Sequence, residues 1–149
     1  MNWATLKEAK RKLTGEEGCI KKDWGGRYSV ALIYPNSYFV GMSNLGFQSV
    51  YGIFNQHDQV VCERFFQEDS ESVSLESQRP LGDFDVIAFS FSYELDYFDA
   101  VRILKSSGIP VFASERDEHH PLVIAGGAAV TAQPDGHHLH QTAFEDAPE

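Results

Sequence analysis

Residues 85–108 read DVIAFSFSYELDYFDAVRILKSSG, and they contain the clearest strand and helix of the chain. Residues 85–90 form a short apolar run of the kind that a parallel sheet buries on both faces. The apolar side chains that follow recur at a spacing of three and four residues, which predicts a helix that ends at Gly108. These side chains are Tyr97, Ala100, Val101 and Leu104.

Three further apolar runs extend this pattern along the chain. We expect strands at residues 30–34, 60–65 and 122–125, the last of them buried like the others. A second helical repeat predicts a helix over residues 44–56, with Ser43 as its N-cap. The order strand, helix, strand, strand, helix, strand is typical of a doubly wound α/β fold with a mostly parallel sheet.

The segments between these units are less regular. We expect a loop at residues 37–43, a polar irregular segment at residues 67–82 with an extended piece near Val73, and a short extended segment at residues 109–112.

The two ends of the chain differ from its middle. Residues 1–26 combine a short amphipathic helix with a polar turn closed by glycines, whereas residues 27–132 carry the α/β pattern. Residues 133–149 have no apolar periodicity and no further strand. We therefore expect an irregular tail and a sheet that lacks its last strand.

Composition narrows the class of protein. The 149 residues carry a formal net charge of −10, which argues against a non-specific nucleic-acid binder, because phosphates need a basic face. No apolar run approaches the roughly twenty residues of a membrane-spanning helix, and the N-terminus does not resemble a secretory signal. The two cysteines, Cys19 and Cys62, lack metal-binding spacing. We expect a cytoplasmic domain with reduced thiols and with no nucleic-acid or membrane partner.

Ligands of open parallel sheets bind beyond the carboxyl ends of the strands. Three segments of this chain meet that description, namely residues 34–45, 90–94 and 126–131. They supply hydroxyl and amide groups beside helix N-termini, and glycines that let a ligand approach the backbone closely. These segments are the candidate binding rim.

Each candidate has a plainer alternative. Ser43 and Ser92 are suited to cap helices, and the adjacent glycines at residues 126–127 are suited to a tight turn. Glu94 and Asp96 can act as acid and base, or can simply favour the dipole of the helix that they begin. The histidines of the tail can bind a metal together, or can lie solvated.

Several motifs occur along the chain in a specific order. They are GMSNLGFQ at residues 41–48, CERFF at 62–66, SLES at 74–77, SYEL at 92–95 and PLVIAGG at 121–127. In these motifs the chain resembles the N-terminal region of uncharacterised bacterial radical S-adenosylmethionine proteins, a region that is itself similar to a cobalamin-binding domain. The resemblance covers about residues 5–134.

The resemblance implies a flavodoxin-like, cobalamin-binding-domain-like fold that precedes a radical core. In such enzymes the core binds a [4Fe–4S] cluster through three cysteines, and the cluster cleaves S-adenosylmethionine. That motif is absent here, so this chain alone is not expected to run the radical chemistry. The downstream core is the partner that the resemblance implies.

Cobalamin is the cofactor that the resemblance raises for this chain itself. Many cobalamin domains carry a histidine in the loop after the first strand, whereas residues 36–41 here read NSYFVG. Two alternatives therefore stay open: the domain binds cobalamin without a histidine ligand, or it is vestigial and binds no corrin. The candidate cofactor-binding positions carried over from the resemblance are Ser43, Asn44, Leu45, Ser90, Ser92, Gly126 and Gly127.

Three functional hypotheses follow. The chain is a fragment of a radical enzyme that positions cofactor or substrate, a free-standing corrin- or nucleotide-binding module, or a non-functional remnant. The polar tail suggests a truncated or frameshifted reading frame with a break near residues 132–136. An uncovered sheet edge would then favour self-association.

Overall fold

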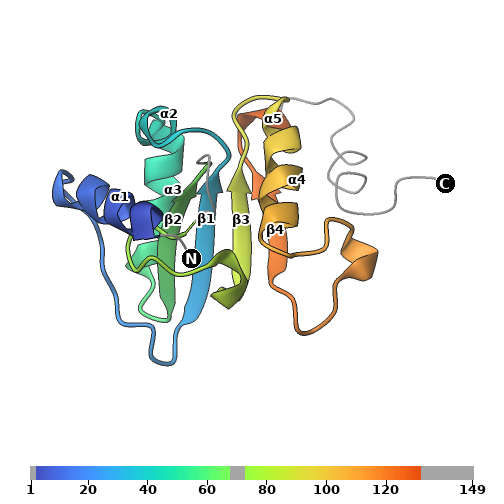
Figure 1. Cartoon of the computed structure of the whole chain (residues 1–149), viewed down its shortest axis with the longest axis horizontal. Coiled ribbons are helices and arrows are strands. Elements are labelled where there is room, and N and C mark those ends of the chain that lie inside the picture. The colour runs from blue at the N-terminus through green and yellow to red at the C-terminus, as the bar shows by residue number, and fades with distance from the viewer. Residues whose placement is uncertain (1–2, 68–72, 132–149) are drawn as a thin grey trace.

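The structure is a computed structural model, and it describes residues 3–67 and 73–131. Apart from two short helices, at Tyr38–Met42 and Ala128–Thr131, its helices and strands follow one another in the predicted order (Figure 1). They are α1 (Trp3–Thr14), β1 (Tyr28–Tyr34), α2 (Tyr38–Met42), α3 (Leu45–Gln56), β2 (Val60–Phe66), β3 (Val86–Ser90), α4 (Asp96–Ser106), β4 (Leu122–Gly126) and α5 (Ala128–Thr131), with short 3₁₀ turns at Leu81–Asp83 and Ala113–Glu115.

The four strands form one parallel sheet in the order β2-β1-β3-β4. Helix α3 lies in the connection from β1 to β2, and α4 in the connection from β3 to β4. The strand order reverses between β1 and β3, so the two connections run in opposite directions and place their helices on opposite faces. The prediction of a doubly wound α/β fold is confirmed.

Successive side chains of a strand point to opposite faces, and this alternation divides the core in two. On one face, Ile33 of β1 and Ile87 of β3 pack with Leu104 of α4. On the other face, Leu32 of β1 and Ala88 of β3 pack with Phe47 of α3. Complete burial of a leucine or phenylalanine contributes about 1.5–3 kcal/mol, so each helix is held mainly by its apolar stripe.

The outer edge of β2 is closed by hydrogen bonds from side chains and a loop. The Asn55 amide donates to the Cys62 carbonyl and accepts from the Cys62 N–H, each at 3.0 Å. Two residues along the strand, the Arg64 N–H donates to the Glu76 carboxylate and the Arg64 carbonyl accepts from Leu75. The backbone groups of this edge are therefore already paired.

Strand β4 differs from the prediction of a fourth buried strand. Among the described residues β4 pairs with β3 alone, and its side chains alternate between exposed and half-buried. Leu122 is 62% exposed and Ile124 is 40% exposed, because no described helix covers this strand on the face that carries α3. This half of that face stays open in the described part of the chain.

Two smaller expectations were wrong. The loop expected at residues 37–43 contains the short helix α2, because Gly41 lets it pack directly on the Phe66 ring, where a Cβ atom would overlap. Ser43 does not cap α3; its hydroxyl donates to the Phe39 carbonyl, and Asn44 is the N-cap. The short extended segment expected at residues 109–112 has an extended backbone at Phe112 and joins no strand of the described sheet.

Some sequence expectations lie outside the described residues. They concern the tail from residue 132 onward, including its histidines, and the centre of the segment at residues 67–82. The ends of that segment are described, and there Val73 forms an isolated antiparallel bridge with Pro80. None of the described helices has the length and apolar character needed to cross a membrane.

Candidate functional site

A groove opens at the carboxyl end of the sheet and runs down the face that carries α3. Its volume is about 370 Å³, within the size range of small-molecule sites. Its lower wall is apolar, formed by Val50 and Phe54 of α3 with Ala88 and Ile124 of the strands. No charged side chain belongs to the described residues that line it. The groove therefore suits a neutral, largely apolar group.

Five of the seven candidate residues line this groove. They are Asn44, Ser90, Ser92, Gly126 and Gly127. The other two do not: Ser43 lines a shallower neighbouring hollow, and Leu45 is 83% exposed. The sequence prediction thus brought together residues from three separate loops, because the carboxyl ends of parallel strands meet at one edge.

Hydrogen bonds hold the polar end of the groove. The hydroxyl of buried Tyr34 donates to Ser92 Oγ at 3.0 Å, and Asn44 Nδ2 donates to the same oxygen at 3.1 Å. The Asn44 Oδ1 atom accepts from the Phe47 N–H at 2.9 Å, which caps α3. Tyr34 was not among the predicted residues, because its position at the end of an apolar run indicates only a core residue.

Asp96 organises the loop between β3 and α4. Its carboxylate accepts hydrogen bonds from the N–H groups of Ser92 and Tyr93, both at 2.9 Å, and the side chain is buried. Glu94 instead lies exposed. Glu94 and Asp96 were candidates either for acid and base or for a structural role at the helix start. The geometry supports a structural role for Asp96, because its carboxylate accepts hydrogen bonds from backbone N–H groups.

The two adjacent glycines have different roles. Gly127 has a φ of 116° and lies against the Phe91 carbonyl, where a Cβ atom would overlap. The tight turn proposed as its alternative is therefore what the structure contains. Gly126 has open space where a Cβ would be, so a side chain there would enter the groove.

A shallower hollow adjoins the groove at Asn44, which lines both. Phe39, Val40 and Tyr93 contribute its apolar wall, and Ser43 contributes a hydroxyl. The two hollows together make the carboxyl end of the sheet a continuous surface with an apolar border.

A buried ion cluster lies on the α3 face of β2, away from the groove. The Arg64 guanidinium contacts Glu76 at 2.6 Å and Glu16 at 2.7 Å, and its carbon lies 4.5 Å from the centre of the Tyr51 ring. These two carboxylates raise the pKa of Arg64, against the effect of burial. Tyr38 donates to Glu16 at 2.6 Å, and burial raises the pKa of that phenol. The cluster ties residue 16 to the sheet.

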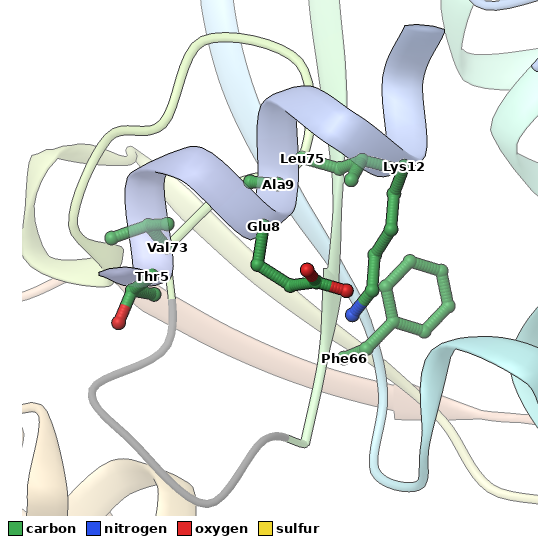
Figure 2. Close-up of a pocket in the computed structure, with 7 residues that line it drawn as sticks. All are labelled: Thr5, Glu8, Ala9, Lys12, Phe66, Val73 and Leu75. Carbon is green, nitrogen blue, oxygen red and sulfur yellow. The ribbon is translucent and has the colours of Figure 1, made fainter. Parts of the chain in front are cut away.

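A small hollow under α1 carries no comparable site. Figure 2 shows the Glu8 and Lys12 side chains above Phe66, with Val73 and Leu75 along the helix. Its volume is about 60 Å³, which admits some water but is far below the roughly 300 Å³ at which small-molecule sites begin. We regard it as a packing gap.

The described residues contain no group of three side chains able to hold a metal ion. Burial raises the pKa of the Cys62 thiol, and Cys19 has a raised pKa for the same reason, so neither is an activated thiolate. His120 Nδ1 lies 2.8 Å from the Asp117 carboxylate on an exposed loop. None of these groups forms a reactive set with the groove.

Comparison with known proteins supports the radical S-adenosylmethionine part of the resemblance seen in the motifs. The family model described as "Radical SAM proteins, N-terminal" matches residues 46–137. An uncharacterized protein of Methanocaldococcus jannaschii is 26% identical over 102 residues, which are 68% of this chain and 20% of that protein. The chain thus spans about a fifth of the length of this curated relative. No solved structure matches it. Because the family model matches more than half of the chain, the protein belongs to the family of N-terminal regions of radical S-adenosylmethionine proteins.

Proposed function

We propose that this chain is the N-terminal domain of a radical S-adenosylmethionine enzyme, and that its groove positions part of a cofactor or substrate for a [4Fe–4S] core further along the polypeptide. The observation that carries the proposal is the groove itself. It opens at the carboxyl end of the sheet and is lined by residues from three rim segments. This edge is where α/β sheets of this topology bind ligands.

The described residues do not fit an iron–sulfur cluster. Cys19 and Cys62 lie far apart in the sequence, and Cys62 is buried in the core between β2 and α3. A cluster and S-adenosylmethionine would supply radical chemistry in the core, so no step of that chemistry is assigned to this chain.

The groove does fit an uncharged portion of a larger cofactor such as cobalamin. The lining residues carry no charge, and the glycines at residues 126–127 leave backbone accessible at the mouth. Because residues 36–41 contain no histidine, we propose a mode in which no histidine from this loop ligates cobalt. In this mode Asn44 and Ser92 orient the ligand through hydrogen bonds, and Val50, Phe54 and Ile124 exclude water from its apolar part.

A titration with methylcobalamin, followed by its visible spectrum, tests the proposal. The wild-type chain is expected to bind at tens of micromolar or tighter, about 6 kcal/mol of binding free energy. Gly126→Val should weaken binding at least tenfold, because valine suits a strand and its side chain would fill the groove. Gly82→Ala is the matched control, since Gly82 also has open space but lies outside the groove.

Failure of the wild-type chain to bind methylcobalamin would remove the corrin form of the proposal. Equal binding by the wild type and Gly126→Val would instead place the ligand outside the groove. A free-standing module and a non-functional remnant remain the competing hypotheses, and only the former predicts binding without a core.

A further inference from the structure

The carboxyl end of the sheet exposes an unusual number of large apolar side chains. Figure 1 shows α2 and the beginning of α4 at this same end. Four residues there are more than 70% exposed, and two more are exposed to a lesser degree. We call these six residues the apolar rim; they are Phe39, Val40, Leu45, Tyr93, Leu95 and Phe98.

The apolar rim is large enough to be an interface. Phe39, Val40 and Tyr93 line one hollow, so the side chains from the two rim loops meet there. An aromatic side chain presents roughly 150–250 Å² in full, so Phe39, Tyr93 and Phe98 at these exposures leave on the order of 400 Å². With the three aliphatic side chains added, the exposed apolar area is at least as large as the largest patch of a typical monomer, roughly 300–600 Å², and is a substantial part of the roughly 800 Å² that each partner contributes to a standard interface.

Among the described residues of this surface, few side chains carry a charge. Residues 35–45 contain no charged side chain, and residues 91–98 contain only Glu94 and Asp96. Asp96 is buried and bound to backbone N–H groups, so it does not face a partner. Aromatic enrichment with depletion of charge is the composition of an interface centre.

Both loops that carry the apolar rim are anchored to the fold. Gly41 seats α2 directly on the Phe66 ring, and Tyr38 packs edge-to-face against Phe39 at 5.6 Å. In the second loop, Asp96 binds the N–H groups of Ser92 and Tyr93. A preformed apolar surface loses little conformational entropy when it binds.

We infer that the apolar rim is the docking surface for the catalytic core of the same polypeptide, an inference that rests on the proposed function. The matched residues are 20% of the Methanocaldococcus jannaschii protein, so in that relative a stretch about four times as long belongs to the same polypeptide. Asn44 lines both hollows, so a partner seated on the apolar rim would lie over the mouth of the groove. Docking would therefore enclose whatever the groove holds.

The first experiment measures whether the surface is accessible and apolar. In the isolated chain, the double variant Leu95→Glu with Phe98→Glu should lower fluorescence of an apolar-surface dye by about one third, because two of six patch residues are removed. The control pair, Trp3→Glu with Tyr28→Glu, changes side chains that are similarly exposed elsewhere. An equal effect of both pairs would overturn the inference.

The second experiment addresses the partner in the polypeptide that carries this chain ahead of a radical core. There, Leu95→Glu with Phe98→Glu should speed protease cleavage between the N-terminal domain and the remainder at least tenfold, because docking protects that connection. Unchanged circular dichroism controls for folding. An unchanged cleavage rate would overturn the docking inference even if methylcobalamin binds, whereas faster cleavage without any methylcobalamin binding would overturn only the cofactor proposal.

Discussion

Replacement of Arg64 by methionine gives a direct test of the buried ion cluster. The side chain of Arg64 is 2% exposed, and its partners Glu76 and Glu16 are 2% and 7% exposed. Methionine preserves most of the apolar stem but leaves two carboxylates without their cation. Arg64→Met is therefore expected to reduce the free energy of unfolding.

The size of the loss follows from the remaining contacts. Removal of one partner of a buried pair costs about 3–5 kcal/mol. Here the Arg64 N–H still donates to Glu76 and the Tyr38 hydroxyl still donates to Glu16, which offsets part of the cost. We expect a loss near the lower limit, about 3 kcal/mol, a large part of the roughly 5–15 kcal/mol that a domain of this size possesses.

Urea unfolding followed by circular dichroism at pH 7 measures this loss. Arg102→Met is the matched control, since Arg102 pairs with Asp99 on the surface and its side chain is 71% exposed. That variant should lose less than about 1 kcal/mol. If Arg64→Met also lost less than about 1 kcal/mol, the cluster would not be held by charge pairing as described.

The stability loss of Arg64→Met should depend on pH, and the direction of this dependence can be predicted. Burial raises the pKa of Glu76 above its ordinary value of 4.5, and loss of the guanidinium removes the main opposing influence. A carboxyl whose pKa is higher in the folded chain than in the unfolded chain destabilises the fold as pH rises. The difference in the free energy of unfolding between wild type and Arg64→Met should therefore become smaller as pH falls from 7 towards 4.5. A deficit that is constant with pH would contradict this origin.

Three further predictions concern the rim and the thiols. Gly127→Ala should lower stability by about 1–3 kcal/mol in urea unfolding, because it combines a left-handed φ with overlap on the Phe91 carbonyl; an unchanged midpoint would show that the turn relaxes freely. Asn44→Ala should cost about 1 kcal/mol through loss of the α3 cap, and Asn44→Asp should retain most of that stability. With a thiol reagent at pH 8, Cys19 should react before Cys62, because Cys62 is fully buried while Cys19 is half-buried; equal rates would contradict this order.

The regular part of the fold could be predicted from local pattern. The runs at residues 30–34 and 85–90 are apolar on both faces, and the helices at α3 and α4 repeat their apolar side chains every three to four residues. These signals are local, so they can be recognised in the sequence without knowledge of the tertiary structure. The expected N-cap at Ser43 was one residue early, because Ser43 and Asn44 are both good caps and only the backbone geometry separates them.

The site could be predicted only in part. Ser90 and Gly126 end strands, while Asn44, Ser92 and Gly127 lie in the connections that follow strands, so all five converge by topology. Tyr34 could not be identified in this way, because its hydroxyl becomes relevant only when Ser92 comes within 3.0 Å. Arg64 was missed for a similar reason: an arginine within an apolar run suggests a solvated strand position unless its two carboxylate partners, 12 and 48 residues away, are known.

The two edges of the sheet differ in whether an additional strand could pair with them. The β2 edge is occupied by Asn55, Leu75 and Glu76, so no additional strand can join there without displacing them. At β4 the described residues place no such obstacle. Insertions, fusions and evolutionary additions to this architecture should therefore accumulate beside β4. The β2 edge should not be extended, because its backbone groups are already paired.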